Sequence, residues 1–180
     1  MLLYPLKVTK YYRILRGGLG DIYFKNIMIA TDGSDCSKLA ANRGIELARL
    51  SGGTVYAVHV VPTAYLFPMD GDYFSSMGVN PYWEPMYEMM YEALKKQGHQ
   101  MVNYVKGLGE AKGVKVELVL LEGHPADELI RYAEEEGMDI VVMGTLGKTG
   151  LDRLLLGSVS ENLVRHSKVP VMVVGGKCKS

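Results

Sequence analysis

Three glycines and a serine in the C-terminal third of the chain have the types and spacing of a phosphate-binding site. Gly144 and Gly147 follow a strand-like run at 139–143, and Gly157 comes after nine further residues, directly before Ser158. Glycine lets backbone N–H groups approach a ligand closely, and a helix N-terminus offers unpaired N–H donors with partial positive charge. The segment therefore predicts a site for a phosphate-bearing ligand.

The stretch Gly147-Lys148-Thr149 has the ending of a P-loop, but the rest of that motif is missing. A P-loop needs another glycine five positions before Gly147, and Val142 stands there, inside the strand-like run. The glycines also follow the fourth predicted strand, and the chain has no G-x-G-x-x-G. The sequence therefore excludes both the P-loop and the dinucleotide-binding fingerprint.

Two other residues bear on this site. Ser158 and Glu161 have capping-box spacing, so we expect Ser158 to cap a helix at 158–166. Capping and phosphate binding are compatible, and the spacing favours neither over the other. Asp32 directly follows the first predicted strand, where open α/β sheets place ligand-binding groups, although Asp-Gly is also common in turns. A carboxylate there could accept ribose hydroxyls or help to hold a divalent cation.

Alternating short apolar runs and amphipathic helices must position these residues. The predicted strands are 25–30, 54–61, 114–121, 139–143 and 169–174, with helices between them. This alternation predicts an open, parallel, Rossmann-like α/β sheet with helices on both faces. We divide the chain into an N-terminal extension at 1–22 and one domain at 23–176, which contains a long loop at 62–84.

Two helices have apolar stripes that we expect to pack on the sheet. In the helix at 34–50 the stripe consists of Leu39, Ala40, Ile45, Leu47 and Ala48. A long helix is expected to begin at Pro85, and its methionines are interpreted as core packing. The residues near one face of that helix are Met86, Met90, Leu94, Met101, Val105 and Leu108.

Composition excludes several classes of function. Lys plus Arg and Asp plus Glu both number 20, so the chain lacks the basic surface expected of a nucleic-acid-binding protein. No apolar run is long enough to span a membrane. Cys36 and Cys178 form no C-x-x-C motif, and we expect two free thiols in a reducing compartment. The four histidines have no metal-binding spacing and are interpreted as structural: His59, His99, His124 and His166.

Residues 24–174 resemble the universal stress protein family. The run from Ile27 through Asp32 to Ser34 is similar to the family's first strand and turn, and His59-Val60-Val61 is similar to the end of its second strand. The spacing Gly144-x2-Gly147-x9-Gly157-Ser158 fits the signature of the family's ATP-binding members. The resemblance implies a sheet with strand order 3-2-1-4-5 and ATP bound between strands one and four.

The resemblance also implies a ligand set and a partner. ATP would bind with Mg²⁺ or Mn²⁺, and Asp32 would lie near the ribose or the metal. We expect a cytoplasmic homodimer formed through the fifth strand, 169–174. The implied nucleotide-binding residues are Ala30, Thr31, Asp32, Val60, Met143, Gly144, Gly147, Lys148, Gly157, Ser158, Val159 and Ser160.

Three functions are consistent with these residues. The first is a regulatory, stress-response protein that binds ATP. The second is a slow ATPase or a nucleotidyl or phosphoryl transferase using the same pocket, for which no general base was found. The third is an interaction module with a vestigial pocket, which the intact glycine spacing disfavours.

Overall fold

The computed structural model describes residues 24–63, 83–145 and 156–175. The predicted extension at 1–22 and most of the predicted loop at 62–84 lie outside these ranges, as do Gly147 and Lys148. The helix that follows this loop begins at Trp83, two residues before the predicted start at Pro85. Proline is tolerated in the first turn of a helix, where its missing N–H has no intrahelical partner.

Five parallel strands form one sheet in the described part of the chain, in the order β3-β2-β1-β4-β5. This confirms the predicted fold class and strand order. The strands are β1 Asn26–Ala30, β2 Thr54–Val61, β3 Val116–Glu122, β4 Ile140–Gly144 and β5 Val171–Val174. The helices are α1 Asp35–Ser51, α3 Trp83–Glu110, α4 Pro125–Glu135 and α5 Ser158–His166.

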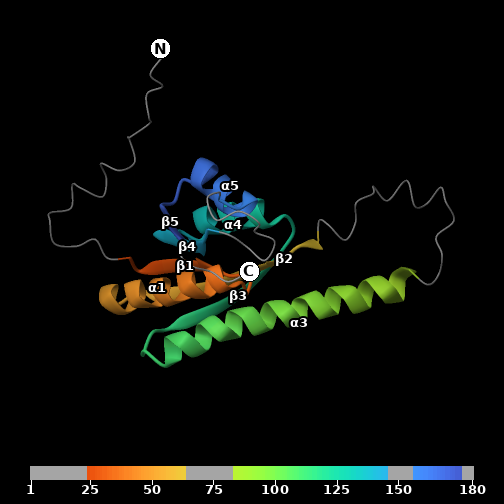
Figure 1. The fold of residues 1–180 in the computed structure, drawn as a ribbon, viewed down its shortest axis with the longest axis horizontal. Helices are drawn as coiled ribbons and strands as arrows, with labels where there is room; N and C mark the ends of the chain where they lie inside the picture. Colours follow the sequence, from red (N-terminus) through yellow and green to blue (C-terminus); the bar gives the residue numbers. More distant parts are fainter. Residues whose placement is uncertain (1–23, 64–82, 146–155, 176–180) are drawn as a thin grey trace, which may run out of the picture.

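The helices cover both faces of the sheet (Figure 1). Helices α1 and α3 lie on one face, and α4 and α5 lie on the other. Alternate residues of β1 serve the two faces, as the two-residue period of a strand requires. Ile27 and Ile29 belong to the core under α1 and α3, whereas Met28 and Ala30 belong to the core under α4 and α5.

Helix α1 packs closely on the sheet because its buried face is built from small residues. A Cβ added to Gly44 would lie 2.6 Å from Cδ1 of Ile29, so the helix backbone packs directly on the Ile29 side chain. Ala40, Ala41 and Ile45 are fully buried beside it. The prediction that Leu39 belongs to this stripe is wrong, because Leu39 lies toward solvent and is 42% exposed.

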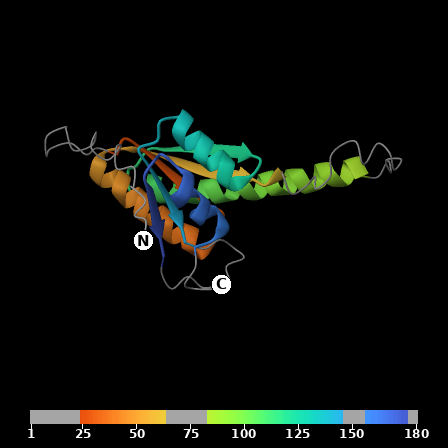
Figure 2. The ribbon, with the colours of Figure 1, turned by 90° about the horizontal axis from the view of Figure 1, so that it is seen from above.

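Helix α3 is longer than the sheet that it covers. Its N-terminal half extends past the sheet in both views (Figures 1 and 2). Met101 is 8% exposed, but Met86 and Met90 are 43% and 45% exposed. The interpretation of the methionines as core packing therefore holds for Met101 and is wrong for Met86 and Met90, because no described strand lies under that end of the helix.

Candidate functional site

A cavity of about 420 Å³ lies at the carboxyl ends of β1, β2 and β4. Strand order reverses between β1 and β4, which is the topological switch point where open α/β sheets bind ligands. The strands line the cavity with residues near their carboxyl ends, and α1, α4 and α5 line it with residues near their N-termini. Helix α3 lines it with side chains from one of its faces. The lining residues are Ala30, Thr31, Asp32, Ser37, Val58, His59, Val60, Pro62, Leu94, Gln97, Met101, Pro125, Leu129, Met143, Gly144, Gly157, Ser158, Val159 and Ser160.

Asp32 holds the turn between β1 and α1 and also lines the cavity. Its Oδ1 accepts hydrogen bonds from the backbone N–H of Ser34 at 3.0 Å and from the Ser34 hydroxyl at 2.6 Å. Gly33, between them, has a φ of 78°, in the left-handed region that favours glycine. Ser34 in turn caps α1 by accepting from the N–H of Ser37 at 3.2 Å. The turn-forming role and a ligand-binding role of Asp32 are therefore compatible.

Thr31 connects this turn to the sheet and to α1. Its backbone N–H donates to the carbonyl oxygen of Val58 at 2.9 Å, and its hydroxyl donates to Oγ of Ser37 at 3.3 Å. Both hydroxyl-bearing side chains are buried. The floor of the cavity is thus a hydrogen-bonded unit that fixes the end of β1 against the first turn of α1.

His59 on β2 contributes both to this framework and to the cavity wall. Its Nδ1 lies 2.8 Å from the carbonyl oxygen of Thr31. A carbonyl oxygen can only accept, so Nδ1 carries the proton in this contact. Gly98 of α3 packs against the ring, since a Cβ there would lie 2.7 Å from Cδ2 of His59. The interpretation of His59 as structural agrees with this geometry, but it overlooked the ring's position in the cavity wall.

Gly144 ends β4 directly against α1. An added Cβ would lie 2.8 Å from the carbonyl carbon of Cys36 and 3.0 Å from the backbone nitrogen of Ser37. Backbone atoms cannot swing aside as side chains do, so this position accepts only glycine without a shift of the helix. The first glycine of the spacing therefore has a packing reason in addition to the predicted close approach of a ligand.

The N-terminus of α5 differs from the prediction. The N-cap is Gly157, with φ −66° and ψ 156°, and Ser158 is the first helical residue. The carbonyl oxygen of Gly157 already accepts the first helical hydrogen bond, from the N–H of Glu161 at 2.9 Å. The Glu161 carboxylate instead pairs with Arg165. The predicted cap at Ser158 and the capping box are therefore wrong.

This start of α5 is fixed to the end of β4 and faces the cavity. The N–H of Gly157 donates to the carbonyl oxygen of Thr145 at 2.8 Å. The buried Ser160 hydroxyl lies within hydrogen-bond distance of two carbonyl oxygens, that of Gly157 at 2.8 Å and that of Thr145 at 3.0 Å. Among the described residues, no side chain caps the helix. The first N–H groups of a helix have no intrahelical partner, so those of Ser158, Val159 and Ser160 are available at the cavity edge.

Helix α3 supplies a wall that the sequence analysis did not identify. Leu94, Gln97 and Met101 line the cavity from this helix, and Met101 also packs on the Asp32 turn. An added Cβ on Gly33 would lie 3.1 Å from Cγ of Met101. The spacing of three and four residues was visible in the sequence, but nothing in it showed that α3 lies beside the strand ends.

The structure brings the described candidates together. Ten of the twelve predicted nucleotide-binding residues line the cavity, and the other two, Gly147 and Lys148, lie outside the described residues.

The expectation of free thiols is wrong for Cys36, which is 3% exposed and disulfide-bonded. Sequence distance between cysteines says nothing about their distance in space. Cys178 lies outside the described residues.

Neither a metal-binding cluster nor a membrane-spanning helix occurs among the described residues. No group of three or more His, Cys, Asp or Glu side chains there could hold a metal ion by itself. None of the described helices is long and apolar enough to cross a membrane.

These features define an open α/β protein with a ligand pocket at its topological switch point. The Universal stress protein family model matches residues 23–175, and the chain belongs to this family. Universal stress protein MJ0531 of Methanocaldococcus jannaschii is 39% identical over 172 residues, which cover 94% of this chain and 93% of the relative.

Solved structures agree with this assignment. MJ0577, also from Methanocaldococcus jannaschii, superposes with a TM-score of 0.69 at 30% identity, covering 88% of this chain and 100% of that protein. The universal stress protein from Archaeoglobus fulgidus in complex with dAMP has a TM-score of 0.57 at 20% identity, covering 86% and 99% of the two chains. At 20% identity, the similarity to the Archaeoglobus fulgidus structure establishes the shared fold and nothing more.

Proposed function

We propose that this universal stress protein is a regulatory protein that binds an adenine nucleotide, with ATP as the expected ligand. The observation that carries the proposal is the continuity of the cavity, which runs from the ends of β1 and β2 to the N-terminus of α5. Its volume of about 420 Å³ lies in the range of small-molecule and cofactor sites. The dAMP bound by the Archaeoglobus fulgidus protein of the same fold is consistent with this ligand class.

The two ends of the cavity suit the two ends of a nucleotide. Apolar side chains, including Val60 at the end of β2 and Leu94 and Met101 of α3, form the part that would take the base. The first turn of α5, whose N-cap Gly157 has no side chain, would take the phosphates, because its N–H groups and the helix dipole favour negative charge. Gly147 and Lys148, which precede α5, would add to the phosphate contacts.

Asp32 would contact the ribose hydroxyls or a metal ion held mainly by the phosphates. It is the one carboxylate among the described lining residues. A single carboxylate together with phosphate oxygens is a common way to hold Mg²⁺ in proteins, and Mn²⁺ prefers similar ligands. The metal would neutralise phosphate charge and orient the nucleotide.

We favour ligand binding over catalysis, because the titratable side chains that line the described pocket are already engaged in structural hydrogen bonds. Asp32 holds the turn through Ser34, and His59 donates to Thr31. Both side chains are therefore fixed parts of the framework.

Isothermal titration calorimetry with ATP, with and without Mg²⁺, tests the proposal. We expect binding by the wild type and weaker binding by Asp32→Asn. Asparagine keeps one oxygen for the hydrogen bonds from Ser34 and replaces the other with an NH₂ group, which cannot accept from a hydroxyl or bind a cation. The turn should therefore survive while the ligand contact is lost. A wild type without measurable affinity for any adenine nucleotide would refute the proposal.

A second pair of variants tests the α5 N-terminus. Proline is favoured at the first position of a helix, and Gly157 has the extended backbone that a residue before proline adopts. Ser158→Pro should therefore preserve α5 while removing one N–H donor, and Ser158→Ala should keep that donor. We expect the proline variant to weaken ATP binding more than adenosine binding. Equal affinities of the two variants for ATP would place the phosphates elsewhere.

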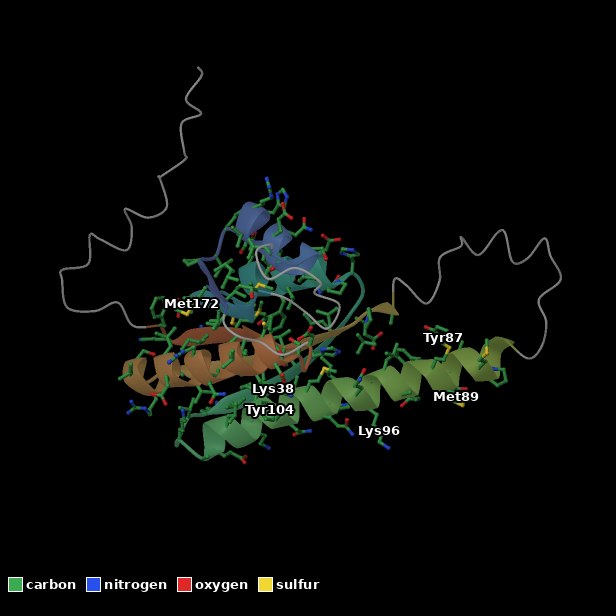
Figure 3. The ribbon with its side chains drawn as sticks, in the orientation of Figure 1. Lys38, Tyr87, Met89, Lys96, Tyr104 and Met172 are labelled. Carbon is green, nitrogen blue, oxygen red and sulfur yellow. The ribbon has the colours of Figure 1, made fainter. Side chains whose placement is uncertain are left out.

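The proposal includes a homodimer through β5 and a cytoplasmic location. β5 is the last strand in the sheet order and exposes Met172 by 37% (Figure 3). An apolar sheet edge of this kind needs cover or pairing. Analytical ultracentrifugation should show a dimer that Met172→Glu dissociates, whereas Val164→Glu on exposed α5 should leave it intact. A wild-type monomer would contradict this part.

A further inference from the structure

The orientation of a nucleotide in the cavity follows from the strand order. Helix α5, where the phosphates would bind, packs beside β5 and follows β4, whereas α3 packs on β2 and β3. The cavity crosses the sheet from the α5 side to the α3 side. If phosphates lie at α5, the base lies at the opposite end, between the end of β2 and α3.

At that end, Gln97 is the polar side chain that α3 contributes to the cavity wall, which also contains the imidazole of His59 on β2. Leu94 and Met101 of α3 and Pro62 after β2 line the cavity beside Gln97. A side-chain amide carries an acceptor oxygen next to N–H donors. Adenine presents the complementary pair, an amino donor beside a ring-nitrogen acceptor, and glutamine recognises adenine in this way in other proteins.

We infer that Gln97 is a specificity-determining residue that hydrogen bonds to the polar edge of the adenine base. This inference rests on the proposed function and deepens it, because it names the group that selects the base. The backbone of α3 is held here by contacts at Gly98 and Met101, one and four residues after Gln97. Gly98 packs against His59, and Met101 packs against the Gly33 turn. The helix therefore presents Gln97 from a fixed position.

The chain contains a matched control for this residue. Gln100 lies three positions further along the same helix, is also exposed, and is not part of the cavity lining. Gln97→Leu and Gln100→Leu make the same chemical change in the same helix. Leucine nearly preserves side-chain volume, so Gln97→Leu removes the hydrogen bonds while keeping the packing at the cavity.

The test measures the affinities of the full-length wild type and both variants for two ligands, ATP and purine riboside triphosphate, which lacks only the amino group. We expect the wild type to prefer ATP about five- to tenfold, which corresponds to one or two hydrogen bonds. Gln97→Leu should weaken ATP binding by this factor and abolish the preference. Gln100→Leu should behave as the wild type, and all three proteins should unfold at similar temperatures.

The possible results separate this inference from the proposed function. If the wild type binds ATP but Gln97→Leu weakens both ligands equally, Gln97 acts on the ribose or phosphates and the inference is overturned. If Gln97→Leu changes neither affinity, Gln97 does not touch the ligand, and the inference is again overturned while nucleotide binding stands. If the wild type binds neither ligand, the proposed function itself fails.

Discussion

The imidazole of His59 donates from Nδ1 to the carbonyl oxygen of Thr31 over 2.8 Å, joining the end of β2 to the end of β1 beneath the cavity. The ring is held in place from the other side by Gly98 of α3. A change on α3 can therefore disturb the cavity without altering any residue of the strand ends.

Substitution of Gly98 tests this coupling. In Gly98→Ala, the new Cβ would lie 2.7 Å from Cδ2 of His59 and 3.0 Å from Cδ2 of Leu120, so the ring or the helix must move. We expect a loss of about 1–3 kcal/mol in the free energy of unfolding and weaker nucleotide binding. Chemical denaturation and calorimetry would measure the two effects.

Gly107 of the same helix provides the control. It has no atom within 4 Å of an added Cβ, so Gly107→Ala should stabilise the protein by about 0.5–1 kcal/mol through helix propensity. Nucleotide affinity should not change. If Gly98→Ala and Gly107→Ala shift the free energy of unfolding in the same direction, the packing of Gly98 against His59 does not determine which residues are tolerated at position 98.

The buried hydroxyl pair of Thr31 and Ser37 predicts a measurable coupling. Thr31→Val removes the donor to Ser37 Oγ and leaves a valine of similar shape in a buried site. We expect each of Thr31→Val and Ser37→Ala to cost about 1–2 kcal/mol of unfolding free energy. The double variant should cost less than their sum by about 0.5–1 kcal/mol. Strict additivity in urea denaturation would show that the hydroxyl contact contributes nothing.

The sheet could be predicted from the sequence because its strands are buried on both faces. The run at 54–61 is almost wholly apolar, and β2 spans the same residues. Strand β1 is buried in the same way, and Asp32, two residues after its end, marks the carboxyl edge. Once strands one and four are neighbours, Asp32 and Gly144 must meet at one site, and they do.

Other features depended on tertiary placement that no local pattern encodes. Helical periodicity showed that Met86 and Met101 share a broad apolar side, but not that the sheet ends between them. The serine–glutamate spacing at the start of α5 suggested a cap at Ser158. Gly157 takes the cap position instead, because its backbone already supplies the first helical acceptor. The part of the cavity wall that α3 forms was missed, because it depends on α3 lying beside the ends of β1 and β2 in space.

The packing of Gly144 on α1 predicts that even a methyl group there is damaging. Gly144→Ala would place Cβ 2.8 Å from backbone carbon of Cys36, so β4 and the first turn of α1 must separate. We expect a loss of about 1–3 kcal/mol of stability without ligand, with weaker nucleotide binding as a second effect. Thermal unfolding of the ligand-free protein measures the first. An unchanged melting temperature with lost binding would instead make Gly144 a ligand-approach residue only.

The contact between Tyr91 on α3 and Glu122 at the end of β3 predicts a displaced titration. The Tyr91 hydroxyl donates to the Glu122 carboxylate. This hydrogen bond, with burial and the nearby charges of Glu122 and Glu92, raises the pKa of Tyr91 to about 12. The neutral phenol is favoured in the folded state, so the stabilising contact is complete below about pH 10. It should be lost as the pH rises through about 12.

Nuclear magnetic resonance of tyrosine labelled at the ring Cζ would follow this titration directly. Glu122→Gln removes the charge and should return the pKa of Tyr91 most of the way toward its ordinary value near 10. Glu92→Gln should lower it less, because Glu92 acts only through a weaker charge interaction. A wild-type Tyr91 that titrates near 10, or equal effects of the two substitutions, would show that the hydrogen bond to Glu122 does not persist in solution.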